Sequence, residues 1–237
     1  MKKIIVSTQR SGLNWLRYNI EYHAGLRTPG KELLISPETQ EQACFIRSHD
    51  PLGSSALKGN GLKKLLPLRG KKKGVAWERI NPKSTKNDII VLLLRDYRES
   101  FVRTADKDYS KFDVYLSNIR FFVQSNSEKK AVFYYEDFVK NPSEMYNLLN
   151  FLQLSRINGH NFDAESVAKA WDSNASASVE KYSVNQAAGG GAMTKKNPDD
   201  FKFHQSKISM EELDHLKTHV RDNLKPAELD LINRYLD

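Results

Sequence analysis

The run of six apolar residues at Ile89–Leu94 constrains the fold of this chain more than any other feature of its sequence. Apolar and polar residues do not alternate in it, which is typical of a central parallel strand that is buried on both faces. Shorter apolar runs at 4–6, 43–46 and 131–135 predict further strands. Because these strands alternate with helical patterns, we expect a three-layer α/β fold with a mostly parallel central sheet flanked by helices.

Helical patterns separate the expected strands and fill the C-terminal part of the chain. They lie near residues 13–23, 98–107, 113–124, 142–152, 164–172, 209–224 and 228–236. Two of the helices have explicit start signals. Asn141 and Pro142 place a capping residue before a first-turn proline, and Ser209 with Glu212 has the spacing of a capping box.

A stretch with few apolar residues interrupts the helical pattern at 173–205. It contains the string Ser-Asn-Ala-Ser-Ala-Ser at 173–178 and three consecutive glycines at 189–191. This composition predicts either a mobile lid or a poorly ordered loop. The length of the chain, 237 residues, is that of a single domain, and we expect one domain over 1–237.

The net charge of the chain, +8, favours anionic ligands. Much of this charge comes from a basic segment at 58–73, which holds Lys58, Lys63, Lys64, Arg69, Lys71, Lys72 and Lys73. The segment is compatible with a solvated loop or with a landing site for an acidic acceptor. It has no interleaved aromatic residues for base stacking, so we do not expect nucleic acid as a partner.

The sequence predicts a cytoplasmic protein without a membrane span. No apolar run approaches the roughly twenty residues of a transmembrane helix, and the run at 4–6 is too short for the apolar region of a signal peptide. Cys44 is the only cysteine, which excludes an intrachain disulfide and indicates a reducing compartment. We expect Cys44 to be a small buried residue and not a nucleophile.

The N-terminal residues form a strand, a short polar loop and the start of a helix. Unpaired backbone N–H groups and the helix dipole make such a helix start a binding site for phosphate-like anions. Arg10 adds a forked cation. The string Gly-x-x-x-x-Gly-Lys-Ser/Thr of nucleoside triphosphatases is absent from the sequence. The alternative is an ordinary strand–helix turn with an exposed arginine.

Residues 9–15, Gln-Arg-Ser-Gly-Leu-Asn-Trp, resemble the Pro-Lys/Arg-Ser-Gly-Thr-Thr-Trp loop of sulfotransferases. In that family the loop holds the 5′-phosphosulfate of the donor, 3′-phosphoadenosine-5′-phosphosulfate (PAPS). The positions that match are Arg10, Ser11, Gly12 and Trp15. Leu13 and Asn14 replace two hydroxyl residues; Asn14 retains a side-chain donor, whereas Leu13 offers only its backbone N–H.

A second string, Arg-Ser-His-Asp-Pro at 47–51, follows a predicted strand and resembles the family's Lys-Thr-His-x-Pro. The resemblance implies that His49 is the general base that takes the proton of the acceptor hydroxyl. A neutral imidazole is suited to this role near physiological pH. The alternative is a structural or surface histidine.

A third string starts at Arg95, directly after the buried strand. In the family an arginine here and a serine eight residues later bind the 3′-phosphate of the donor. Arg95 matches, Arg103 stands in the place of the serine, and Ser100 lies one helical turn earlier. The alternative is that Arg98, Glu99 and Arg103 form a solvated helix face with pairing four residues apart.

A fourth string, at 131–138, resembles the family's apolar strand followed by Tyr-Glu-Asp-Leu. The resemblance implies that Tyr135 borders the adenine and faces Trp15 across the purine, while Glu136 has a structural role. The alternative is that both aromatic rings belong to the core. The Arg-Lys-Gly string that closes over the 3′-phosphate is absent, and its possible substitutes are Lys195, Lys196, Lys202 and His204.

Together these strings imply a PAPS-dependent sulfotransferase with a fold like that of the P-loop kinases. It would transfer a sulfuryl group to a hydroxyl or amine of a small-molecule or glycan acceptor and release 3′-phosphoadenosine-5′-phosphate (PAP). Arg10 would act as an electrostatic clamp, and no metal is required. The alternatives are a kinase-like nucleotide-binding protein and a non-catalytic basic module that binds nucleic acid or acidic glycans. The sequence identifies neither the acceptor nor the oligomeric state.

Overall fold

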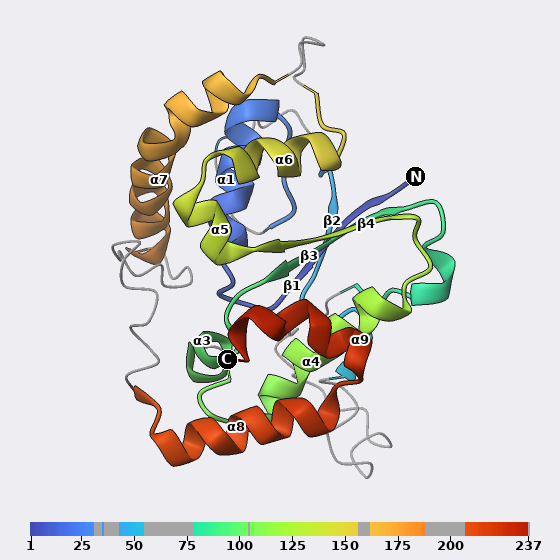
Figure 1. The fold of residues 1–237 in the computed structure, drawn as a ribbon. Helices are drawn as coiled ribbons and strands as arrows, with labels where there is room; N and C mark the ends of the chain where they lie inside the picture. Colours follow the sequence, from blue (N-terminus) through green and yellow to red (C-terminus); the bar gives the residue numbers. More distant parts are fainter. Residues whose placement is uncertain are drawn as a thin grey trace, which may run out of the picture. The chain divides into compact units, whose positions relative to one another are not determined.

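The chain forms an α/β fold with a four-stranded, all-parallel sheet flanked by helices (Figure 1). The computed structural model describes residues 1–30, 35, 43–54, 78–103, 105–155, 162–187 and 207–236. The strands are β1 (Lys3–Ser7), β2 (Ile46–Ser48), β3 (Ile89–Leu94) and β4 (Lys129–Tyr134). The expectation of an α/β fold with a parallel sheet is therefore confirmed.

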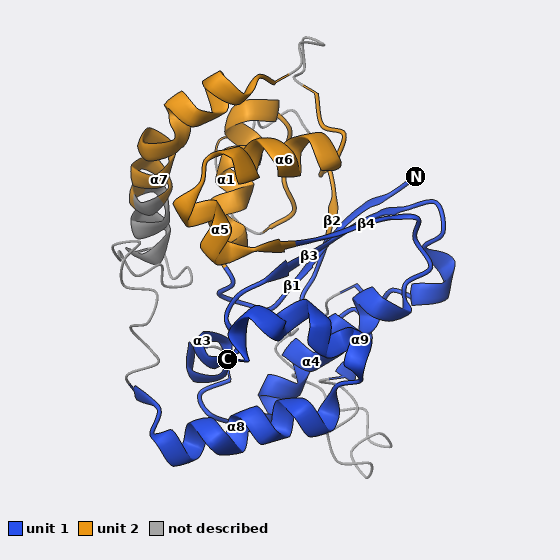
Figure 2. Cartoon of the chain, in the orientation of Figure 1, with its two compact units in different colours: residues 1–11, 47–132, 204–237 blue, residues 12–46, 133–203 orange. Residues whose placement is uncertain are grey.

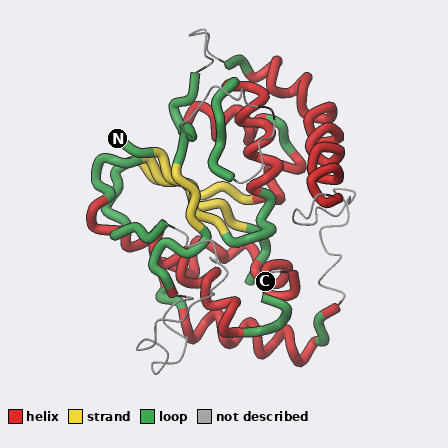
Figure 3. The backbone as a smooth tube through the Cα atoms, turned by 180° about the vertical axis from the view of Figure 1, so that it is seen from behind, coloured by secondary structure: helices red, strands yellow, loops and turns green. Residues whose placement is uncertain are grey.

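The strand order in the sheet is β2-β1-β3-β4. Figure 3 shows the strands of the sheet from behind, in yellow. β1 and β3 are parallel neighbours, with Ser7 in register with Leu93. All six residues of β3 are buried, as predicted for a central strand. The chain leaves β1 toward β2 on one side and later adds β3 on the other side of β1. In open parallel sheets such a reversal marks the place where ligands bind, at the carboxyl ends of the strands.

The described residues divide into two compact units (Figure 2). Unit 1 consists of Met1–Ser11, Arg47–Val132 and His204–Asp237. Its helical elements are η2 (Pro82–Ser84), α3 (Tyr97–Arg103), α4 (Tyr109–Gln124), α8 (Met210–Asn223), α9 (Pro226–Leu229) and η5 (Asp230–Tyr235). α4 packs against β1, β3 and α9.

The capping box predicted at the start of α8 is confirmed. The Ser209 hydroxyl accepts a hydrogen bond from the Glu212 N–H at 3.1 Å, and the Ser209 N–H donates to the Glu212 carboxylate at 2.9 Å. α4 begins four residues before the predicted start. The Asp108 carboxylate caps it by accepting from the Ser110 N–H at 2.8 Å.

Unit 2 consists of Gly12–Ile46 and Phe133–Phe203. Its helices are α1 (Leu13–Ala24), α5 (Tyr135–Lys140), α6 (Ser143–Phe151) and α7 (Ala164–Ala187). α7 packs against α1 and α6. Because the two units interleave along the chain, neither corresponds to a contiguous stretch of sequence, and the single domain over 1–237 stays a prediction.

The interruption predicted to begin at residue 173 is wrong up to Ala187, because α7 continues through these residues. Two polar residues near the start of this stretch are buried. The buried Asn174 amide donates to the Asn19 side chain of α1 at 3.0 Å, and the buried Ser178 hydroxyl donates to the carbonyl of Ala175 at 2.8 Å. Residues 188–206 lie outside the described part of the chain.

The structure also differs from the predictions for the second strand, for Cys44 and for Tyr135. The second strand is Ile46–Ser48 and not 43–46, and Cys44 just before it is half-buried rather than buried. Tyr135 begins the helix α5, which the sequence did not predict. The basic segment at 58–73 lies outside the described residues.

Among the described helices, none combines the length and the apolar character needed to cross a membrane.

Candidate functional site

In unit 1, three polar elements follow the carboxyl ends of the neighbouring strands β2, β1 and β3. His49 comes directly after β2, the loop at 8–11 follows β1, and Arg95 comes directly after β3. Parallel strands bring these ends to one edge of the sheet. This edge contains the position between β1 and β3 where the order of the strands reverses, so the structure places three of the predicted site elements together.

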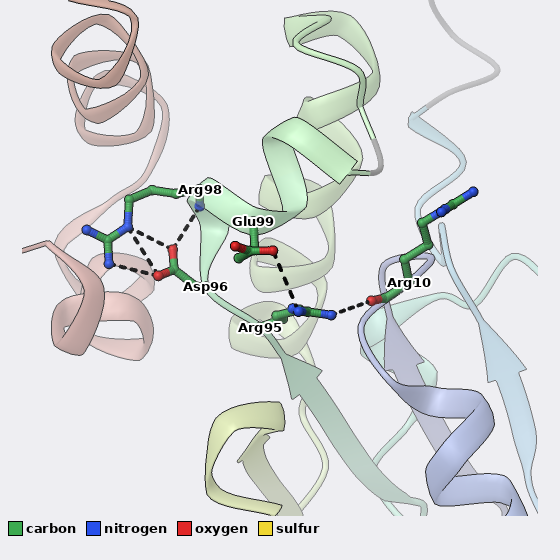
Figure 4. Close-up of polar contacts among 5 residues, drawn as sticks. All are labelled: Arg10, Arg95, Asp96, Arg98 and Glu99. Atoms are coloured by element: carbon green, nitrogen blue, oxygen red, sulfur yellow. Dashed lines mark hydrogen bonds and ion pairs between the residues drawn. The ribbon is translucent and has the colours of Figure 1, made fainter. Parts of the chain in front are cut away.

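The loop after β1 has an unusual backbone. Arg10 has a φ of 61°, in the left-handed region that non-glycine residues rarely adopt. The Ser11 hydroxyl donates to the carbonyl of Thr8 at 2.6 Å and is almost fully buried. Ser11 therefore closes the loop, whereas the Arg10 side chain is exposed and extends away from Arg95 (Figure 4).

Arg95 joins the loop to the start of α3 (Figure 4). Its Nη1 donates to the carbonyl of Arg10 at 3.2 Å, and its Nη2 lies 3.6 Å from the Glu99 carboxylate. Ser100, the next residue on α3, is buried, and Arg103 at the end of the helix is half-buried. The guanidinium of Arg95 thus holds the strained Arg10 backbone in place while Glu99 balances its charge.

The alternative, in which Arg98, Glu99 and Arg103 form one solvated face, is wrong. Glu99 is buried and contacts Arg95. Arg98 instead turns back to Asp96, with its Nη2 donating to the carboxylate at 2.8 Å and its Nε at 2.9 Å (Figure 4). This two-pronged contact matches the planar fork of a guanidinium to a carboxylate, a geometry that the helical spacing alone does not indicate.

His49 is held in one orientation by the last residue of β1. Its Nδ1 donates to the Ser7 carbonyl at 2.5 Å and lies 3.2 Å from the Ser7 hydroxyl. A neutral imidazole that donates from Nδ1 carries its basic lone pair on Nε2. Burial lowers the pKa of His49 to about 4; the bond to Ser7 opposes this effect, and the positive charge of Arg47 adds to it. His49 is therefore a neutral base at physiological pH.

This pKa shift predicts how the stability of the protein depends on pH. The folded state binds the His49 proton only near pH 4, whereas the unfolded state binds it below about pH 6.5. Unfolding should therefore become easier as the pH falls from 6.5 to 4, by up to about 3 kcal/mol in the free energy of unfolding. Urea unfolding at pH 7 and pH 5 measures this loss. A His49→Gln variant should lose less over the same range, and an equal loss would contradict the assignment to His49.

Tyr115 and Asn118 of α4 bind backbone carbonyls of the site, and neither was predicted from the sequence. The Tyr115 hydroxyl donates to the carbonyl of Arg95 at 2.9 Å, and the Asn118 amide donates to the carbonyl of His49 at 3.2 Å. Both side chains are buried. The sequence does contain a sign of this role, because a tyrosine and an asparagine lie three residues apart on the apolar face of the helix. Polar groups that are buried on such a face need a hydrogen-bond partner.

In unit 2, Gly12 begins α1 with a φ of 85° and lies directly against Tyr135. A Cβ atom added to Gly12 would lie 2.1 Å from Cδ2 of the Tyr135 ring. Leu13 is buried in the core, whereas Asn14 is half-buried and its Oδ1 accepts a hydrogen bond from Arg17. The glycine of the predicted loop is thus required by both its backbone conformation and its neighbour.

The structure does not place Trp15 and Tyr135 on opposite sides of a purine-sized slot. Their ring centroids lie 6.2 Å apart at an interplanar angle of 76°, an edge-to-face contact. Trp15 also contacts Trp171 of α7, with centroids 4.6 Å apart. Trp15 is buried, so its ring belongs to the core of unit 2, and Tyr135 is the half-exposed partner.

The contacts described above do not test the predictions for the C-terminal part of the chain or for metal binding. Lys195, Lys196, Lys202 and His204 fall in the part of the chain that is not described. No group of three or more metal-ligating side chains occurs among the described residues. Neither a scan against protein-family models nor a search of curated proteins found a match for this chain.

Proposed function

We propose that this protein is a sulfotransferase that moves a sulfuryl group from PAPS to a hydroxyl or amine of an acceptor. One observation carries the proposal. A buried, neutral His49, with its basic nitrogen set by the Ser7 carbonyl, shares an edge of the parallel sheet with the loop of Arg10 and with Arg95. The four family-like strings of the sequence support the same assignment. We also propose that the parallel sheet and its helices form a three-layer, P-loop-like fold.

His49 is suited to accept a proton from the attacking group. In the proposed step the acceptor oxygen or nitrogen forms a bond to sulfur, its proton passes to Nε2 of His49, and the sulfur–oxygen bond to the 5′-phosphate breaks. The electron pair of that bond leaves with PAP. A low pKa keeps the imidazole unprotonated before the reaction, and the Ser7 carbonyl stabilises the imidazolium that forms.

Arg10 and Arg95 have different tasks in this proposal. The exposed Arg10 side chain is available to stabilise charge that develops on the leaving phosphate, and it keeps its proton throughout. Arg95 supports the backbone of Arg10, and in this proposal its positive charge also attracts the 3′-phosphate, together with Ser100 and Arg103 of α3. Positioning and electrostatics supply most of the expected rate.

Calorimetry with PAP tests the proposal directly. We expect PAP to bind in the micromolar range without Mg²⁺, because the described site offers cations and N–H donors and needs no bridging metal. Adenosine 5′-phosphate, which lacks the 3′-phosphate, is the matched control and should bind more weakly. Binding of ATP only with Mg²⁺ would favour a kinase-like protein, and binding of polyanions alone would favour a basic module. Either result would overturn the proposal.

A further inference from the structure

A fully buried arginine, Arg17, lies one turn into α1, two residues after the predicted anion-binding string at 9–15. The Arg17 side chain has no measurable exposure to solvent. Its Nε donates to the Thr28 hydroxyl at 2.9 Å, and its Nη1 donates to Oδ1 of Asn14 at 3.2 Å. Gly30 lies flat against the guanidinium, since an added Cβ there would be 2.3 Å from Nη2. The guanidinium is therefore fixed on several sides.

A buried carboxylate balances this charge through a shared hydroxyl. The Thr28 hydroxyl, which accepts from Arg17, donates to Oε1 of Glu21, and the Thr28 N–H donates to the same oxygen at 3.1 Å. The other oxygen, Oε2, accepts from the N–H of Ile35 at 2.8 Å. A buried charge with a satisfied counter-charge is costly to move, so Arg17 presents its Nη1 to Asn14 in one fixed direction.

The chemistry of Arg17 decides which end of the Asn14 amide faces outward. A guanidinium only donates hydrogen bonds, so the atom of Asn14 that contacts it must be the oxygen. The NH₂ group then points away from Arg17, and it makes no hydrogen bond within the part of the chain that the structure describes. Asn14 is the second residue of α1 and is half-buried, in the turn whose backbone N–H groups have no helical acceptors.

We propose that Arg17 is a positioning residue, which holds the Asn14 amide so that its NH₂ group donates to the 5′-phosphate end of the bound nucleotide. The inference rests on the proposed function. It explains how asparagine can stand at a position where a hydroxyl would be expected. Without Arg17 the amide could rotate, and fixing its donor on the anion would cost part of the binding free energy.

Two variants at residue 14, one of them isosteric with asparagine, separate this role from a structural one. Asn14→Asp retains an acceptor for Arg17 but replaces the outward donor by a carboxylate oxygen. We expect the midpoint of thermal unfolding to stay the same or rise, while the affinity for PAP falls by about 10- to 100-fold or more. Asn14→Ser, which keeps a donor, should retain most of the affinity. If Asn14→Asp binds PAP as tightly as the wild-type protein does, the inference is wrong.

A double-mutant cycle tests whether Arg17 acts through Asn14. Arg17→Lys keeps the charge but lacks the fork that holds both Thr28 and Asn14. We expect it to weaken PAP binding in the wild-type background and to have no further effect in the Asn14→Leu background. Equal losses in both backgrounds would show that Arg17 has only a structural role. If the wild-type protein does not bind PAP at all, it is the proposed function that fails, so the two failures are distinguishable.

Discussion

Replacing His49 by glutamine should lower kcat by about 10²- to 10⁴-fold and leave the affinity for PAP nearly unchanged. Glutamine keeps a polar, uncharged side chain of similar length, although its amide nitrogen corresponds to Nε2 and not to the Nδ1 that donates to the Ser7 carbonyl in the wild-type protein. It cannot take up a proton near neutral pH. The change therefore removes the base with little change in the size of the side chain.

Release of PAP from PAPS measures this effect, with the acceptor that the wild-type protein uses best among phenols, sugars and amines. His215→Gln is the matched control, because His215 lies exposed on α8 and pairs with Glu211 on the same helix. It should leave both turnover and PAP binding unchanged. An equal loss of turnover and of PAP binding in His49→Gln would contradict the role of His49 as general base.

The pH profile gives an independent measurement of the same group. Because burial lowers the pKa of His49 to about 4, the acidic limb of kcat/KM for the wild-type protein should lie near that value. An unperturbed histidine would place it near pH 6.5. The limb should disappear in the residual activity of His49→Gln, and a limb near pH 6.5 would show that another group controls the rate.

The sequence predicted the elements that depend on interactions between residues close together in the chain. The unbroken apolar run at Ile89–Leu94 coincides with β3, and the Ser209–Glu212 pattern coincides with a capping box. Both signals reflect interactions within a few residues or burial on both faces of a strand. The continuation of α7 through Ser173 was missed, because its stability depends on a tertiary contact between Asn174 and Asn19.

In the candidate site, too, the sequence predicted the positions of residues but not the tertiary contacts that orient them. Strand ends predicted the positions of His49 and Arg95, because parallel strands bring their carboxyl ends to one edge. The contacts that orient these residues come from elsewhere, since Tyr115 and Asn118 of α4 hold their carbonyls. Such contacts bridge residues tens of positions apart, and no short string in the sequence encodes them.

Aromatic geometry was the least predictable part of the site. The sequence supplies the identities of Trp15 and Tyr135 but not the angle between their rings, which packing determines. Trp171 contacts Trp15 and draws it into the core of unit 2. If the adenine contacts an aromatic residue of this pair, the half-exposed Tyr135 is therefore the better candidate than Trp15.

Replacing Gly12 by alanine should strongly destabilise the protein. The φ of 85° disfavours an L-residue by about 1–2 kcal/mol, and the new Cβ would lie 2.1 Å from a ring carbon of Tyr135. Overpacking of this kind costs about 1–3 kcal/mol more. We expect the free energy of unfolding to fall by about 2–5 kcal/mol, as measured by urea unfolding, and the affinity for PAP to fall with it, since Gly12 forms the start of α1.

The Tyr135→Ala background separates the two causes. Without the ring, the added methyl group no longer overlaps a neighbour at that distance, and only the backbone cost of the left-handed conformation remains. Gly12→Ala should then cost only about 1–2 kcal/mol, so the two substitutions should be clearly non-additive. An identical cost in both backgrounds would mean that Tyr135 does not lie against Gly12. In that case the close approach of ring and loop, which shapes the start of α1, would not exist in solution.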